Sequence, residues 1–182
     1  MKKIGVIISV IVIVLIVILG TTYKEVNKDY LRIHIRANSN AEVDQLVKYK
    51  VKDEIVVSIT PYIVDCKNFE EVKMVLGDNL SLIDDIANRV LKQNGFNYTA
   101  KSRICNEEFP TRNYNGYTLE AGFYDALIVN LGRAEGDNWW CVVYPPLCFT
   151  NACTGSNVVY KSRILDLINN FKNNLFFSYL VV

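Results

Sequence analysis

The chain has 182 residues, of which 51% are apolar and 21% are charged, and its formal net charge is +1 at pH 7. This length suits one domain plus a short targeting segment, and the apolar fraction is sufficient for a packed core. The near-neutral balance, without any run of like charges, gives no indication of a nucleic acid or an anionic membrane surface as a partner.

The N-terminus carries a targeting segment. Residues 4–19 form an unbroken apolar run directly after Lys2 and Lys3. As a helix this run spans roughly 24 Å, against a hydrocarbon core of ~30 Å, so it fits either a signal peptide or a membrane anchor. The preceding lysines place the rest of the chain outside the cytoplasm. We therefore expect a signal peptide or anchor at residues 1–22 and one exported domain at residues 23–182.

The first half of the domain predicts one strand followed by three helices. Residues 30–36 alternate, with Arg32, His34 and Arg36 on a basic outer face. The residues Asn38-Ser39-Asn40 then supply turn and N-cap chemistry. Helical spacing of apolar residues predicts three helices, at residues 42–58, 67–76 and 79–93.

The second half predicts strands and a final helix. Residues 98–104 alternate, residues 112–116 indicate a turn, and residues 123–131 form an apolar run typical of a central strand. Residues 132–137 then turn the chain back into a strand at residues 139–144, as in a hairpin. A last helix is expected from residue 158, with an apolar tail docked on the domain. The predicted fold class is α+β, with a small, mostly antiparallel sheet packed with helices.

The segment from Asn138 to Phe149 is the most informative part of the chain. It holds both tryptophans, Trp139 and Trp140, and the prolines Pro145 and Pro146, which end its strand. Neighbouring strand residues point to opposite faces, so one tryptophan is expected in the core and the other on the outer face. Because Trp and Tyr dominate binding hot spots, the cluster fits an interface as well as internal packing. Besides an interface and internal packing, the aromatic cluster also fits stacking on cell-wall sugars.

Five cysteines are an odd number for an exported chain. Cys141 and Cys148 are the best-placed pair, because the two prolines between them bend the chain back. Cys153 competes for Cys148, and the alternative is that all five are reduced, buried apolar residues. A bridge of this size restricts the unfolded chain by about 2–3 kcal/mol.

Catalytic and metal-binding motifs are scarce. The chain has a single histidine, His34, and lacks Cys-x-x-Cys and His-Glu-x-x-His motifs, so we expect no metal and no cofactor. A cysteine hydrolase stays as an alternative, with His34 activating Cys141 and Asp125 or Asn138 orienting the imidazole.

Two acidic pairs suggest a glycosidase, which needs two carboxyl groups around one bond. Asp84 and Asp85 are neighbours on a predicted helix and face different directions, so we expect them to be solvated. Glu107 and Glu108 are expected in a loop before Phe109.

Three stretches of the chain resemble a known family. Residues 132–149 read GRAEGDNWWCVVYPPLCF, residues 31–40 read LRIHIRANSN, and Phe-Pro-Thr at 109–111 precedes Gly-Phe-Tyr at 122–124. In this order and spacing, over about 120 residues, they are similar to the signature of the stage II sporulation protein R family. That family consists of exported signalling proteins of endospore-forming bacteria.

The resemblance implies a signalling ligand rather than an enzyme. It implies export from the forespore into the space between the two sporulation membranes, where the protein activates a membrane-embedded aspartic protease. That protease processes the precursor of the early mother-cell sigma factor. Contact with the receptor's outer face would favour its active state. Whether the domain is released or stays tethered by residues 4–19 is left open.

By motif transfer, the resemblance also gives a set of partner-contacting or family-defining residues. They are Arg32, His34, Arg36, Asn38, Ser39, Asn138, Trp139, Trp140, Tyr144, Pro145, Pro146 and Phe149.

Overall fold

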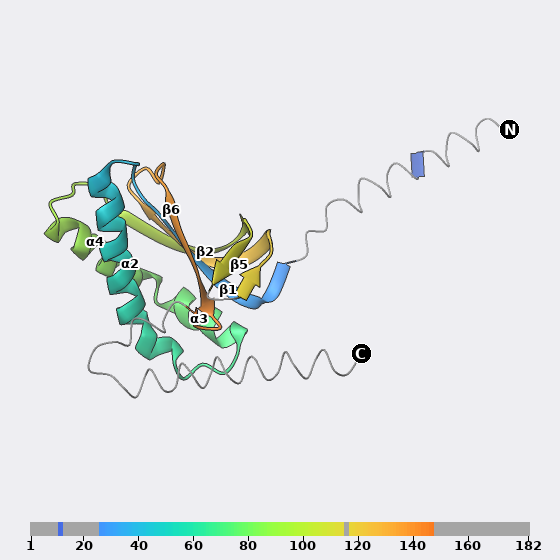
Figure 1. Cartoon of the computed structure of the whole chain (residues 1–182). Coiled ribbons are helices and arrows are strands. Elements are labelled where there is room, and N and C mark those ends of the chain that lie inside the picture. The colour runs from blue at the N-terminus through green and yellow to red at the C-terminus, as the bar shows by residue number, and fades with distance from the viewer. Residues whose placement is uncertain (1–10, 13–25, 115–116, 148–182) are drawn as a thin grey trace.

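The computed structural model describes residues 11–12, 26–114 and 117–147 (Figure 1). In this part of the chain, helices cover one face of a four-stranded sheet, and two further strands form a separate two-stranded sheet. The elements are β1 (Val26–Arg36), α2 (Glu42–Ile63), α3 (Phe69–Asp78), α4 (Leu80–Gln93), β2 (Ala100–Phe109), β3 (Arg112–Tyr114), β4 (Tyr117–Leu119), β5 (Gly122–Leu131) and β6 (Asn138–Tyr144).

None of the helices described here is long and apolar enough to cross a membrane. The targeting run at residues 4–19 lies outside the described residues except for residues 11–12. The helix expected from residue 158, Cys148, Cys153 and Phe149 also lie outside them.

The strands of the main sheet lie in the order β2-β5-β1-β6. β1 and β5 are parallel, and the other neighbours are antiparallel. The predicted α+β class with a mostly antiparallel sheet is confirmed, and β5 is central as predicted. The predicted hairpin between β5 and β6 is wrong, because β1 lies between them. The centre of β1 is buried, so its backbone N–H and C=O groups need hydrogen-bond partners. Its inner position supplies them from β5 on one edge and β6 on the other.

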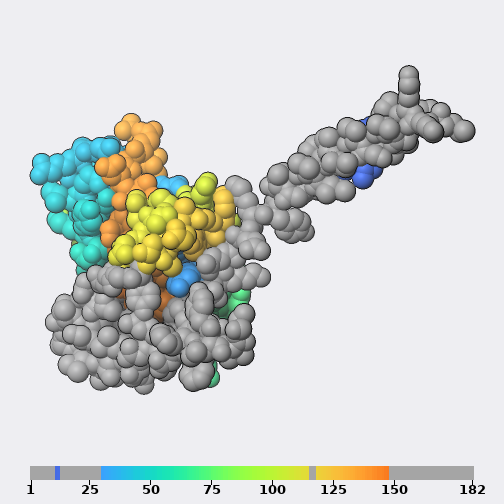
Figure 2. Space-filling view, turned by 45° about the vertical axis from the view of Figure 1, so that its right-hand side comes forward, coloured from blue at the N-terminus to red at the C-terminus, as the bar shows by residue number. Residues whose placement is uncertain are grey.

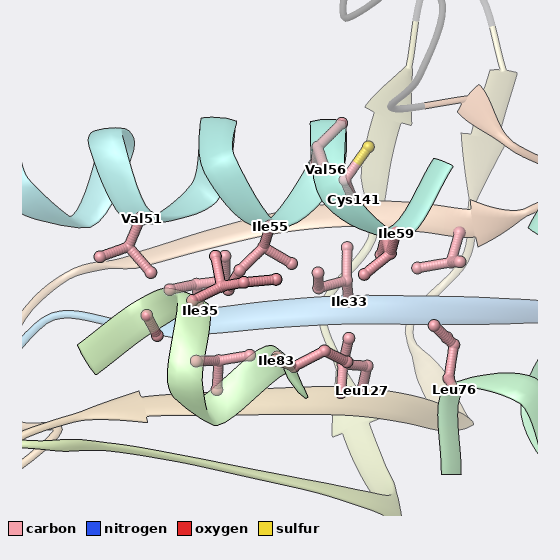
Figure 3. Close-up of a cluster of buried hydrophobic side chains, with 14 of the residues drawn as sticks. Ile33, Ile35, Val51, Ile55, Val56, Ile59, Leu76, Ile83, Leu127 and Cys141 are labelled. Atoms are coloured by element: carbon pink, nitrogen blue, oxygen red, sulfur yellow. The ribbon is translucent and has the colours of Figure 1, made fainter. Parts of the chain in front are cut away.

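The hydrophobic core lies between the helices and the sheet. Figure 3 shows side chains of α2 directed towards those of β1, with contributions from α4 and β5. α2 runs on to Ile63, beyond the predicted end at residue 58, because Ile59 and Ile63 are also buried in this core. Residues at the centre of the core are Ile33, Ile35, Val51, Ile55, Ile59, Ile83 and Leu127.

A side-chain cap is seen at the start of α3, whereas α2 begins after Ala41 without one, so the N-cap expected from Asn38-Ser39-Asn40 is wrong. Asn68 caps α3, since its Oδ1 accepts a hydrogen bond from the Glu71 N–H at 3.0 Å. The Glu71 carboxylate in turn accepts from the N–H of Lys67, the residue before the cap, at 2.7 Å. Residues 112–114, expected as part of a turn, instead form β3, which pairs with β4. β2 is longer than predicted and includes Glu107 and Glu108, which were expected in a loop.

Candidate functional site

The sheet face turned away from the helices holds most of the predicted site residues on β1. Leu31, Ile33 and Ile35 point into the helix-side core, so Arg32 and His34 point the other way. The predicted alternation is therefore confirmed. Both polar side chains are buried, however, with exposed fractions of 0% and 1%. Aromatic side chains and the β3–β4 hairpin cover them.

The strand register aligns residues of this face in rows across the sheet. His34 lies opposite Ile128 on β5 and Trp140 on β6, and Ile128 lies opposite Arg103 on β2. The next row contains Cys105, Ala126, Arg32 and Val142. Residues distant in sequence thus surround His34 and Arg32.

Arg32 lies in an aromatic enclosure. Its guanidinium carbon is 4.2 Å from the ring centre of Phe109 and 4.8 Å from that of Tyr124. Nη2 donates to the Tyr114 hydroxyl at 2.6 Å. Burial lowers the pKa of Arg32, partly offset by Tyr114, yet the group stays a cation at physiological pH. Its Nε and Nη1 are buried and have no hydrogen-bond partner among the described residues.

His34 is stacked on Trp140, with ring centres 3.7 Å apart and planes inclined by 19°. Its Nδ1 lies 3.6 Å from Oε1 of Glu107, which also pairs with Arg36. Neither ring nitrogen makes a hydrogen bond of good geometry within the described part of the chain, although the side chain of Asn138 interacts with the imidazole. Burial, together with nearby arginine charges, lowers the pKa of His34 to about 4. The imidazole is therefore neutral at pH 7.

Asn38 and Ser39 belong to a buried polar network centred on Asp44 of α2, which we call the Asp44 network. The carboxylate of Asp44 accepts hydrogen bonds from Ser39 Oγ at 2.6 Å, Asn38 Nδ2 at 2.8 Å and the Tyr98 hydroxyl at 2.6 Å. Burial raises the pKa of Asp44, but these hydrogen bonds outweigh it and the pKa is lowered overall. The network joins the loop after β1 to the start of α2 and to the segment before β2.

The same loop is fastened to the turn between β5 and β6. Asn38 Oδ1 accepts from the Arg133 N–H at 3.0 Å, and the Gly136 N–H donates to the carbonyl oxygen of Ala37 at 3.0 Å. Figure 2 shows the start of α2, in light blue, against this orange turn. A Cβ on Gly136 would lie 2.2 Å from the carbonyl oxygen of Ser39, so only glycine permits this approach.

Sequence reasoning assigned Asn38 and Ser39 to partner contact, and the structure gives them internal hydrogen bonds. Whether they also contact a partner stays a prediction. Asp44, Tyr98 and the Glu107 contact with His34 were not among the features that the sequence indicated. The spacing Ser39-to-Asp44 offered only a general helix-start signal, and nothing in the sequence pointed to Tyr98.

Cys141 and His34 do not form a catalytic pair. Cys141 lies opposite Ile33 and is buried in the helix-side core, whereas His34 lies on the other face of the sheet. Asp125, a proposed orienting group, is bound to Lys73 at 2.5 Å instead. The arrangement expected for a cysteine hydrolase is thus contradicted, because a pleated strand sends neighbouring residues to opposite faces.

Cys141 is disulfide-bonded and its partner lies outside the described residues. The pairing with Cys148 therefore stays a prediction. Cys66 and Cys105 are free thiols.

The tryptophans point to opposite faces, as predicted. Trp139 packs against the helix-side core, and Lys52 Nζ lies 5.5 Å from its ring centre. Trp140 packs on the other face, where His34 covers one side of the indole. That stacked side is not available to a sugar ring. Pro145 and Pro146 are buried.

Asp84 on α4 is buried, so the expectation that Asp84 and Asp85 are both solvated is wrong for Asp84. Asp84 accepts hydrogen bonds from the N–H and Oγ of Ser102 and from Lys101 Nζ. Burial raises the pKa of Asp84, but these bonds outweigh it and lower the pKa overall. Asp85 is exposed. No cluster of metal-binding side chains occurs among the residues described.

Comparison with known proteins now gives the family. The sequence model of stage II sporulation protein R matches residues 27–154, which include every strand and helix from β1 to β6. The chain belongs to the stage II sporulation protein R family.

A curated family member supports this assignment. The stage II sporulation protein R of Bacillus subtilis (strain 168) is 34% identical over 128 residues, which are 70% of this chain and 57% of that protein. The chain thus matches a little more than half the length of this relative. Comparison with solved structures finds no match.

The family resemblance has a structural counterpart. The stretches LRIHIRANSN and GRAEGDNWWCVVY form the paired strands β1 and β6, together with the two loops that hydrogen bonds join. Two of the three stretches that resemble the stage II sporulation protein R family thus lie side by side in the fold.

Proposed function

We propose that this chain is the sporulation signal that the forespore exports to the mother cell. In this proposal it acts between the two sporulation membranes and activates the membrane-embedded aspartic protease that processes the mother-cell sigma factor precursor. Membership of the stage II sporulation protein R family supports the sporulation role. Residues 4–19 direct export and, if uncleaved, tether the domain to the membrane.

The protein acts by contact rather than by catalysis. The observation that supports this most directly is the placement of His34 and Cys141 on opposite faces of the sheet. The nucleophile and the base that the sequence offered therefore cannot meet. A ligand that binds the active state of its receptor more tightly than the inactive state shifts the population towards the active state.

Stoichiometry tests this proposal. The purified full chain is titrated onto vesicles that contain the protease and its precursor substrate, and cleavage of the precursor is followed on gels. We expect activation to saturate at a fixed molar ratio of chain to protease, since each receptor must hold a ligand. Complete activation by a small fraction of that amount would indicate a catalyst and contradict the proposal. A protease variant without its catalytic aspartates serves as the control.

A further inference from the structure

Four arginines gather on the sheet face that the helices leave uncovered, and we call them the arginine face: Arg32, Arg36, Arg103 and Arg112. The charges of Arg32, Arg36 and Arg103 all act on His34. Arg112 lies near Arg32, and its guanidinium carbon is 5.7 Å from the ring centre of Trp140. β1, β2 and β3 thus bring four cations around one patch of aromatic rings.

The arginine face has few balancing charges. Glu107 is the carboxylate that contacts it, and Glu107 is paired with Arg36. Arg32, Arg103 and Arg112 form no ion pair within the described residues. A buried cation without a counter-ion carries a large desolvation cost, and two N–H groups of Arg32 also lack acceptors.

Several cations elsewhere in the described part of the domain are paired, whereas Lys48, Lys50, Lys67 and Lys92 form no ion pair there either. Lys73 binds Asp125, Lys101 binds Asp84, and Arg89 lies 3.5 Å from Glu54. The chain as a whole is nearly neutral. What distinguishes this face is that arginines without an ion pair gather beside aromatic rings.

We propose that the arginine face binds an acidic segment of the partner protein. Arginine binds carboxylates through two parallel N–H···O bonds, and this geometry suits several carboxylates along an extended peptide. Arg103 and Arg112 are exposed, so they are accessible to such a segment, and Arg36 is partly exposed. The partly exposed Trp140 supplies apolar surface beside the charges. The inference rests on the proposed function, because the partner in question is the receptor protease.

A binding experiment tests the surface by itself. The full chain in a neutral detergent is titrated against a fluorescein-labelled octaglutamate peptide, and fluorescence anisotropy is measured. We expect saturable binding that weakens with added salt, and none to a matched octaglutamine peptide. The variant pair Arg103→Gln and Arg112→Gln should weaken binding by at least about tenfold, while Arg89→Gln, an exposed arginine on α4, should not.

Each other outcome overturns the proposal. If the octaglutamate peptide does not bind, or binds the double variant as tightly as the unmodified chain, the face is not an acidic-peptide site. If inorganic phosphate at equal charge concentration displaces the peptide fully, the face is a simple anion site. Failure of the unmodified chain to activate the protease would instead count against the proposed function. The two failures are thus distinguishable, because the peptide assay contains no protease.

Discussion

At the scale of single residues, burial decides what the polar side chains of the family signature can do. His34 and Arg32 alternate with core residues on β1, and a sequence pattern alone suggests that they face water. The structure buries them among Phe109, Trp140 and Tyr124. Burial keeps the His34 ring neutral at pH 7. Arg32 forms no ion pair with a carboxylate among the described residues.

The stability of the domain should depend on the protonation of His34. Its pKa is lowered from 6.5 to about 4 in the folded state, so the unfolded chain binds the proton more tightly. The free energy of unfolding therefore does not depend on His34 protonation above pH 6.5. It falls by up to about 3 kcal/mol as the pH decreases from 6.5 towards 4, because the unfolded chain takes up the proton first. Glu107, Arg36, Arg32 and Arg103 are the charged groups around the ring. Urea unfolding at pH 7 and pH 4.5 measures the change.

The variant His34→Phe isolates this effect from the titration of carboxylates. It keeps the stack on Trp140 and removes the ionisable group. We expect its free energy of unfolding to fall less between pH 7 and pH 4.5 than that of the unmodified chain. Equal pH dependence in both proteins would show that His34 is not the group responsible.

Asp44 should be essential for stability rather than for signalling. The variant Asp44→Ala leaves Asn38, Ser39 and Tyr98 without their shared acceptor, so we expect a loss of about 2–4 kcal/mol in the free energy of unfolding. Asp53→Asn, on the exposed side of the same helix, should change it by less than about 0.5 kcal/mol. Denaturant unfolding provides both values. A loss for Asp44→Ala no larger than the control would contradict the role of the network.

At the scale of elements, the turn between β5 and β6 is fixed by its contact with the loop after β1. Gly132 has a positive φ of 56°, and Gly136 lies directly on the backbone of Ser39. The turn does not join hydrogen-bonded neighbours. It carries the chain past the end of β1, and this explains why it needs six residues and a set of tertiary hydrogen bonds.

Substitution of the two glycines at Gly136 and Gly77 should have opposite effects. Gly136→Ala places a methyl group against the Ser39 carbonyl, and we expect a loss of about 1–3 kcal/mol. Gly77→Ala meets nothing within 4 Å on the exposed side of α3, so we expect a gain of about 0.5–1 kcal/mol from helix propensity. Thermal unfolding compares the variants. A stabilised Gly136→Ala protein would show that the turn is free to move.

At the scale of the whole molecule, the two faces of the sheet have different tasks. The helix side is a conventional apolar core and contains Cys141. The other side gathers the polar residues of the signature with aromatic rings. We expect partner contact on this second side, since the first is already covered by α2, α3 and α4.

The disulfide partner of Cys141 can be identified directly. We expect a peptide map under non-reducing conditions to link Cys141 to Cys148, and a link from Cys141 to Cys153 would contradict that pairing.

Burial, with nearby Glu71 and Asp65, raises the pKa of the Cys66 thiol, so iodoacetamide should label Cys66 more slowly than the partly exposed Cys105. Mass spectrometry measures the link and both labelling rates.

The sequence by itself determined the class of fold and most of its elements. Apolar periodicity is a local property, so it predicted the helix at Leu80–Gln93 to within a residue. It also predicted the alternation of β1 and the opposite directions of Trp139 and Trp140. The uncommon run from Gly132 to Phe149 identified the family, because a long specific match needs no structural information.

Only the tertiary structure decided which residues meet. The insertion of β1 between β5 and β6 depends on pairing between distant strands, and periodicity carries no information on strand order. That pairing placed Glu107 beside His34, Tyr98 on Asp44 and Arg103 near Arg36. It also separated Cys141 from His34, since the two residues lie on paired strands but on opposite faces of one sheet.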